Sequence, residues 1–380
     1  MRGWIKQGVD AYLNLKSFKT KRKFVVLESD DWGSLRTKDK FTRQHLNAIN
    51  PSVANDKYVQ LDSIASESDL DNLFEVLQSV KDSKGNPACI TANVCTANPD
   101  FDRIKADQFE RFHYKPFTET LKENSKGVDL FQLWQKGSQQ GCFVPQLHGR
   151  EHLHALAWLA ELKAGNADLL KAFELETWGI PYSALLRQKR KNVQAGLDVY
   201  KLDGEPDYHK NWIKDSAQIF EKAFGFSAKS FIPPAFTWHP SIHKNLVKAN
   251  IMGLQGIKLQ YQPKLYNTNG YKRIPHYIGE IDKSTGIIYT TRNAFFEPYM
   301  NPNKDWVDSC MAEINKAFEQ NKPAIIGTHR INFIGRLDEA HRDRNLKMLK
   351  SLLKAIEKTH PEVEFIDSAT LIQQIKSSAL

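Results

Sequence analysis

The chain of 380 residues contains only four cysteines, and none of them forms a CxxC pair. The sequence therefore has neither a cysteine-based zinc knot nor a redox motif, and its free thiols are typical of a reducing compartment. The first residues show no apolar segment followed by a small-residue cleavage site, so no signal peptide is visible. No run of about 18 apolar residues occurs, which argues against a membrane-spanning helix. We therefore expect a cytoplasmic location.

Charge of one sign is in excess, but it is not concentrated. The formal net charge is +9, and the only dense basic cluster near the start of the chain runs from Lys16 to Lys23. Nucleic-acid-binding proteins usually gather basic side chains on one face. We therefore predict no nucleic-acid partner, and interpret the charge as a solvated surface with a mild preference for acidic partners.

Short apolar runs of strand type alternate with helical patterns along most of the chain. The expected strands are residues 24–29, 88–94, 142–147, 230–232, 251–256, 287–291, 324–327 and 363–366. Such alternation favours a parallel sheet, and this many units favours closure into a (β/α) barrel of seven or eight strands. We expect one domain over residues 23–380 after an N-terminal helical arm at 1–22. Residues 154–224 lack a strand-like run and predict a helical insertion, and residues 261–286 predict a loop or hairpin.

Two histidines follow the third expected strand, His148 directly and His152 four residues later. If the chain continued as a helix, the two imidazoles would share one face and could bind a single metal ion. Packed or surface histidines are the commoner explanation of such a pair unless a third ligand lies nearby.

Other reactive side chains also stand where expected strands end. Asp30 and Asp31 end the first strand, Arg292 follows the strand from 287, and His329 follows the strand from 324. In a (β/α) barrel these ends meet at one mouth, which carries the chemistry. Adjacent aspartates leaving a strand point in different directions, so one can ligate a metal while the other takes a proton from a water molecule.

These segments resemble the motifs of the polysaccharide deacetylase family, carbohydrate esterase family 4. The similar segments, in the family's order, are Ser29-Asp30-Asp31-Trp32-Gly33, His148-Gly149-Arg150-Glu151-His152, Ile232-Pro233-Pro234-Ala235-Phe236 and, after Asp305-Trp306, Ala324 to His329. The resemblance implies a distorted (β/α) barrel that binds one divalent metal through Asp31, His148 and His152. Zinc suits these ligands best, with cobalt, nickel and iron as alternatives. The resemblance also implies Asp30 as general base, His329 as general acid, and removal of acetyl groups from N-acetylated sugars of a polysaccharide or its precursor.

Two departures mark a divergent member of this family. Ile232 stands where the family has an arginine that orients the base, and Arg150, Arg292 or Arg330 are possible substitutes. Pro302 stands where the family has an acidic residue that tunes the histidine acid, and Glu297 is the nearest replacement.

Six residues are predicted to contact substrate, namely Trp32, Arg150, Phe236, Trp238, Arg292 and Asn332. Aromatic rings at the barrel rim stack on sugars, although packing explains them equally well. A backbone N–H near Phe236 is the expected oxyanion donor, beside the metal. As a lone polar residue in its loop, Asn332 can also serve the loop's own hydrogen bonds.

The sequence is also compatible with two other functions. One is a glycan-binding protein on the same fold that has lost catalysis. The other is a glycoside hydrolase, which needs two carboxylates about 5 to 9.5 Å apart. Asp30 and Glu297 are the candidates for that pair.

Overall fold

The computed structural model describes residues 11–181, 193–265 and 270–378. Its main sheet has the strand order β10-β11-β7-β6-β5-β2-β1-β13-β12, with β14 paired to β1, and only the β10–β11 pair is antiparallel. The strands of this sheet are β1 (Phe24–Trp32), β2 (Ile90–Cys95), β5 (Phe143–Gly149), β6 (Ser230–Phe231), β7 (Gly253–Gly256), β10 (Glu280–Ile281), β11 (Ile288–Thr291), β12 (Ala294–Phe295), β13 (Ala324–His329) and β14 (Glu364–Phe365).

One extended segment joins the two edges of this sheet. β11 pairs with β7 over four residues, and after Arg292 and Asn293 the same segment continues as β12, which pairs with β13. The side chain of Asn293 reinforces the change of partner, because it donates to the carbonyl of Pro323 and accepts from the N–H of Ile325. The sheet thus curls into the distorted barrel that the sequence predicts.

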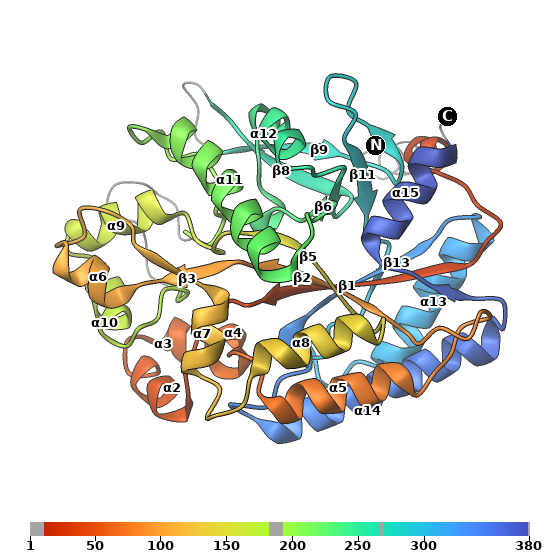
Figure 1. Cartoon of the computed structure of the whole chain (residues 1–380), viewed down its shortest axis with the longest axis horizontal. Helices are drawn as coiled ribbons and strands as arrows, with labels where there is room; N and C mark the ends of the chain where they lie inside the picture. Colours follow the sequence, from red (N-terminus) through yellow and green to blue (C-terminus); the bar gives the residue numbers. More distant parts are fainter. Residues whose placement is uncertain (1–10, 182–192, 266–269, 379–380) are drawn as a thin grey trace.

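Helices cover the outside of the strands. They are α2 (Lys40–Leu46), α3 (Pro51–Ala54), α4 (Lys57–Leu61), α5 (Glu67–Gln78), α6 (Phe101–Ala106), α7 (Phe117–Glu123), α8 (Leu130–Gln139), α9 (Ala155–Lys163), α10 (Ala167–Glu174), α11 (Glu205–Phe224), α12 (His243–Lys248), α13 (Trp306–Glu319), α14 (Glu339–Thr359) and α15 (Ser368–Ser378). In Figure 1, α5, α8 and α14 run side by side below the central strands, while α11 and α12 lie above them.

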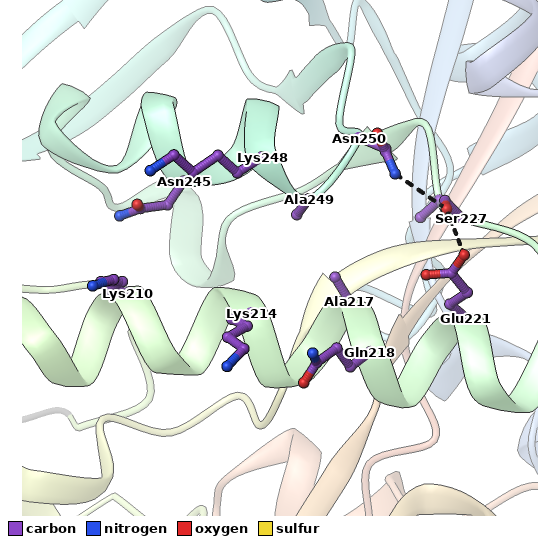
Figure 2. Close-up of a pocket in the computed structure, with 11 residues that line it drawn as sticks. Lys210, Lys214, Ala217, Gln218, Glu221, Ser227, Asn245, Lys248, Ala249 and Asn250 are labelled. Carbon is purple, nitrogen blue, oxygen red and sulfur yellow. Dashed lines mark hydrogen bonds between the residues drawn. The ribbon is translucent and has the colours of Figure 1, made fainter.

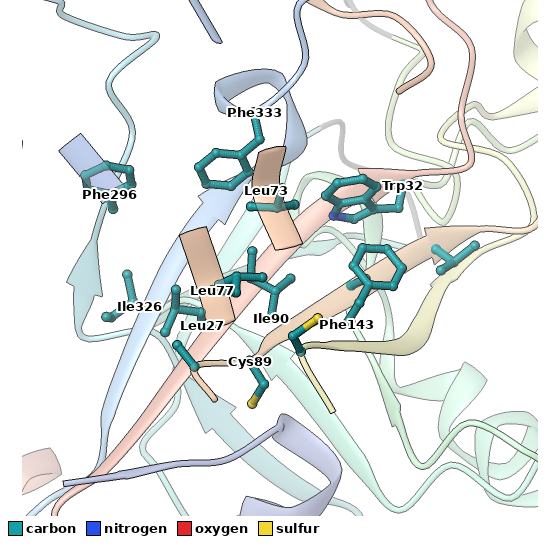
Figure 3. Close-up of a cluster of buried hydrophobic side chains, with 14 of the residues drawn as sticks. Leu27, Trp32, Leu73, Leu77, Cys89, Ile90, Phe143, Phe296, Ile326 and Phe333 are labelled. Atoms are coloured by element: carbon teal, nitrogen blue, oxygen red, sulfur yellow. The ribbon is translucent and has the colours of Figure 1, made fainter. Parts of the chain in front are cut away.

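The main core lies between the strands and this lower layer of helices. α5 begins at a capping box in which Ser66 and Asp69 satisfy each other's backbone N–H groups, and its apolar stripe faces the sheet. Figure 3 shows Leu73 and Leu77 of this stripe over Leu27 and Ile90 of the strands. Burial of such apolar side chains is the main source of stability for the barrel wall.

A second apolar cluster holds the insertion against the rest of the chain. Trp158 and Phe173 of α9 and α10 pack with Leu46, Val59 and residues of neighbouring short helices. The predicted helical insertion at 154–224 contains α9, α10 and α11, but its residues 182–192 lie outside the described part. The predicted hairpin is present as β8 (Leu259–Pro263) paired with β9 (Tyr271–Pro275), and β3 (Ala97–Pro99) pairs with β4 (Tyr114–Pro116) in another small sheet.

The N-terminal arm is described only from residue 11, and residues 11–16 are helical. Within the described residues, every helix is either too short or too polar to cross a membrane.

Candidate active site

Asp30 and Asp31 lie near the end of β1, where the strand loses its regular pairing. The register with β2 shifts between Ser29 and Trp32, and Asp31 has a left-handed backbone with φ of 73°. This conformation is rare for a residue with a side chain and marks strain at functional sites. The bulge lets the two neighbouring carboxylates serve different partners.

Asp30 is bound by Arg292, one of the three arginines that the sequence offers as substitutes for the arginine missing at Ile232. Arg292, between β11 and β12, donates to Oδ1 and Oδ2 of Asp30 at 2.6 and 2.8 Å, and to Glu28 at 2.8 Å. Asn93 also donates to Oδ1 of Asp30 at 2.8 Å. Burial alone would raise the pKa of Asp30, but the guanidinium of Arg292 holds it below its ordinary value. Among Arg150, Arg292 and Arg330, Arg292 is therefore the arginine that takes the place left open by Ile232.

Asp31 faces both predicted histidine ligands. Its Oδ1 lies 3.4 Å from Nε2 of His148 and 3.7 Å from Nε2 of His152, and this buried oxygen has no hydrogen-bond partner. The Nδ1–H of His148 donates to the carbonyl of Ile232 at 2.8 Å, so Nε2 is the ring nitrogen that faces Asp31. Burial lowers the pKa of His152 to about 3, despite the opposing carboxylate of Asp31, so its imidazole is neutral.

The spacings from Asp31 to the two histidines fit a divalent metal, although the donor atoms that all lie within 4.8 Å of one another are those of Asp31, His148 and Cys95, without His152. Two nitrogen or oxygen ligands at about 2.0–2.1 Å from a tetrahedral zinc ion lie about 3.4 Å apart, close to both spacings measured from Asp31. The ionised carboxylate of Asp31 and the neutral imidazole of His152 are also in the protonation states that a metal requires. The prediction that the two histidines share one face of a helix is wrong, however, because His148 belongs to β5 and His152 lies in the loop before α9. The strand end and the loop, rather than a helix turn, bring the pair together.

Two further residues reach Asp31 that the sequence did not single out for this role. Donor atoms of Asp31, His148 and Cys95, at the end of β2, all lie within 4.8 Å of one another. A guanidinium nitrogen of Arg36 lies 3.6 Å from Oδ2 of Asp31, while the same side chain pairs with Asp62 at 3.1 Å. Burial alone would raise the pKa of Asp31, but Arg36 and the histidines hold it well below the ordinary value. Only the register of β2 against β1 places Cys95 here.

His329, at the end of β13, forms the other side of the mouth. Its Nε2 lies 3.6 Å from Oδ2 of Asp30, and its Nδ1 lies 2.6 Å from Oε1 of Glu297. Burial would lower the pKa of His329, but Glu297 and the aspartates raise it to about 9. Asn332 donates to Oε2 of Glu297 at 2.8 Å and fixes that carboxylate. Glu297 therefore stands in for the acidic residue missing at Pro302.

The six residues predicted to contact substrate occupy different kinds of position in the structure. Arg292 reaches Asp30, and its guanidinium lies 5.8 Å from the ring of half-buried Phe236. Asn332 is buried and serves Glu297 and its own loop rather than an open surface. The N–H of Phe236 donates to the carbonyl of Pro233, so this group is not a free oxyanion donor.

The substrate contact predicted for the remaining three residues is contradicted by their packing and ion pairs. Trp32 is 1% exposed and packs edge-on against Trp134 and Phe143 in the main core. Trp238 is buried, with its indole N–H directed at His243. Arg150 is bound in two places to Glu151 and also to Asp215. Their side chains are committed to the fold, and the packing alternative for the two tryptophans holds.

A second buried polar group lies within the insertion, between the start of α9 and α11. Nε2 of His154 lies 3.0 Å from Oε1 of Glu205, and both cluster with His209. Nδ1 of His154 accepts from the N–H of Ala157 as the cap of α9, and its Nε2 approaches Glu205 without forming a hydrogen bond. His154 thus serves as the cap of α9.

A cavity of about 380 Å³ lies away from these residues, between α11 and α12 (Figure 2). Lys210, Lys214 and Lys248 line it, and Ser227 bridges Asn250 and Glu221. It contains none of the residues proposed for catalysis.

Comparison with known proteins gives likeness only at the level of structure. No protein-family model matches the sequence, and no curated protein matches it. One similar structure is named "putative polysaccharide deacetylase" from Mycobacterium smegmatis, with 9% identity, TM-score 0.47, and coverage of 96% of this chain and 94% of that one. The chain resembles polysaccharide deacetylases. A carbohydrate esterase family 4 pseudoenzyme from Bacillus anthracis is also similar, at 9% identity and TM-score 0.39, covering 92% of this chain and 66% of that one.

A third similar structure is the 4-alpha-glucanotransferase from Thermococcus litoralis, at 10% identity and TM-score 0.46. The alignment covers 93% of this chain but only 40% of that protein. Because all three identities are low, the functional argument rests on the residues of this chain.

Proposed function

We propose that the protein is a metal-dependent deacetylase that hydrolyses the acetamide of an N-acetylated sugar in a glycan or glycan precursor. The observation that carries the proposal is the unpaired carboxylate oxygen of Asp31, which faces Nε2 of His148 and of His152. Asp30 and His329 lie directly beside this cluster, 3.6 Å apart. A metal-ligand set next to a carboxylate and a protonated imidazole is suited to amide hydrolysis.

Asp31, His148 and His152 would hold the divalent metal, with zinc as the best fit and cobalt, nickel or iron as alternatives. When bound, such an ion acidifies water and polarises a carbonyl group. Asp30 is the proposed general base that accepts a proton from the attacking water. Its two bonds from Arg292 orient the carboxylate but also make it a weak base. Proton transfer to Asp30 therefore requires an unusually acidic water.

His329 is the proposed general acid. Since its Nδ1 is bonded to Glu297, its Nε2–H faces Asp30 and the mouth. The imidazole is charged at neutral pH because Glu297 and the aspartates raise its pKa to about 9. As the C–N bond breaks, Nε2 gives its proton to the departing amine, and the acetyl group leaves as acetate.

The glycoside hydrolase alternative is disfavoured by the same contacts. Both oxygens of Glu297 are occupied, one by His329 and the other by Asn332. Glu297 is therefore held by its own partners and is not free to act with Asp30 as the second carboxylate that hydrolysis of a glycosidic bond requires.

The proposed location is the cytoplasm, with a precursor of a surface glycan as substrate. All four cysteines are buried free thiols, which suits a reducing compartment. The net charge of +9 suits sugars that carry phosphate or uronate groups. Fractionation of the native cells tests the location, and recovery of the protein outside the cytoplasm contradicts it. Kinetics that do not weaken with rising salt contradict the role of charge.

The decisive experiment measures metal content and products together. Protein loaded with zinc or cobalt is incubated with a panel of acetylated sugars, and acetate and new reducing ends are quantified. We expect one metal per chain and acetate without new reducing ends, with both metal and acetate lost in His148→Ala and His152→Ala. New reducing ends without acetate favour a glycoside hydrolase. Sugar binding without either product favours the inactive binding protein.

A further inference from the structure

The sulfur of Cys95 belongs to the same cluster as the proposed metal ligands. Cys95 ends β2, and its register neighbour on β5 is Gly149, the residue after His148. Its side chain is fully buried, and its sulfur lies within 4.8 Å of donor atoms of both Asp31 and His148. Oδ1 of Asp31 is buried in this same cluster without a hydrogen-bond partner, which leaves it available to a metal ion.

The backbone fixes Cys95 in this position. A Cβ placed on Gly33, whose φ is +81°, would come within 2.5 Å of the carbonyl oxygen of Cys95. The end of β2 therefore packs closely against the turn that follows β1. The other three cysteines differ, since Cys89 stands before β2, Cys142 stands before β5 and Cys310 lies on α13, and all three pack in the main core. Cys95 is the cysteine that the strand ends carry to the mouth.

We propose that Cys95 supplies a thiolate ligand to the metal that Asp31 and His148 hold. The inference rests on the proposed metal site but goes beyond the ligand set of Asp31, His148 and His152. Coordination deprotonates the thiol, and its proton passes to solvent. A soft sulfur donor favours zinc, cobalt or iron over magnesium, calcium or manganese.

A sulfur ligand also has a consequence for the reaction. Catalytic zinc sites commonly keep three protein ligands and one open position, whereas four protein ligands close a tetrahedral site. With Cys95 bound, water and the acetyl oxygen have room only if the coordination number rises or His152 leaves. His152 is the more remote nitrogen, at 3.7 Å from Asp31 against 3.4 Å for His148.

Cobalt substitution tests the proposal without any substrate. The metal-free protein is loaded with one equivalent of Co²⁺, and its absorption spectrum is recorded. A thiolate ligand gives an intense near-ultraviolet sulfur-to-cobalt charge-transfer band, which oxygen and nitrogen ligands do not give. We expect this band in the unmodified protein and in Cys89→Ser, but not in Cys95→Ser or Cys95→Ala. Affinity should fall in the Cys95 variants by at least the ~10–100-fold that loss of an outer partner costs.

The outcomes separate this proposal from the proposed function. Stoichiometric cobalt with visible ligand-field bands but no charge-transfer band in the unmodified protein overturns the sulfur ligand and leaves the deacetylase site intact. No bound cobalt overturns both. The unmodified protein alone gives these two results, so a Cys95 variant that fails to fold does not protect the proposal. A band that persists in folded Cys95→Ala also refutes it.

Discussion

Arg292 donates two hydrogen bonds to the carboxylate of Asp30, although 262 positions separate the two residues in the sequence. The same guanidinium donates to Glu28, so one buried cation neutralises two buried carboxylates on β1. The contact exists because the segment between β11 and β12 changes its partner strand at Arg292. The residue that joins the sheet edges thereby also orients the proposed base.

Replacing Arg292 is expected to destabilise the fold. In Arg292→Met the carboxylates of Glu28 and Asp30 remain buried without their cation, and breaking such a pair typically costs ~3–5 kcal/mol. Equilibrium urea unfolding measures the loss. The control is Arg273→Met on exposed β9, which should change stability by no more than ~0.5 kcal/mol. Equal stability of the two variants contradicts the role assigned to Arg292.

Asp30→Asn is expected to keep the metal and the fold but lose turnover. The amide preserves the shape of the side chain, yet it accepts a proton far less readily than a carboxylate. Loss of a positioned base typically costs ~10²–10⁴-fold in rate. Acetate release and elemental analysis on the same preparation check this prediction. Near-normal turnover would show that another group activates the water.

His329 is expected to set the basic limb of the pH–rate profile. The imidazole donates only while protonated, and the fold raises its pKa to about 9. Activity should therefore hold through neutral pH and fall as pH rises through about 9. In His329→Ala the residual rate should show no such limb, while metal content stays unchanged. A limb that survives in this variant rules out His329 as the acid.

Glu297→Gln should move the same limb toward lower pH. The neutral amide removes the charge that favours the imidazolium, so burial lowers the pKa of His329 from about 9. The free energy of unfolding should also decrease as the pH rises. The raised pKa stabilises the fold below the unfolded value of about 6.5, and this contribution is lost as pH rises through about 9. NMR titration of the His329 ring measures the shift directly, and an unchanged pKa refutes the pairing.

Gly149→Ala should unfold more readily than Gly141→Ala. Both glycines have positive φ, so either alanine is strained, but they differ in the space around them. A Cβ at Gly149 would lie 1.8 Å from the ring of Trp212 on α11, whereas none lies near Gly141. Overpacking of this kind adds ~1–3 kcal/mol or more. Thermal unfolding of both variants isolates this term, and equal losses would contradict the close packing of α11 on β5.

The sequence determined the elements and most of the proposed chemistry. Alternating apolar runs predicted the parallel strands, and polar residues at their ends predicted one mouth containing Asp30, Asp31, His148 and His329. These inferences succeeded because hydrophobic periodicity and strand direction are local properties of the chain.

Only the tertiary structure selected Arg292 from three arginines and brought Cys95 and Arg36 to Asp31. It also shows that Trp32, Trp238 and Arg150 are buried away from a substrate surface, because packing and ion pairs already occupy their side chains. Strand register and side-chain burial depend on partners far along the chain, and a one-residue change of register turns every side chain to the other face. The local sequence therefore predicts which residue ends a strand, whereas the closed sheet determines which group that residue faces.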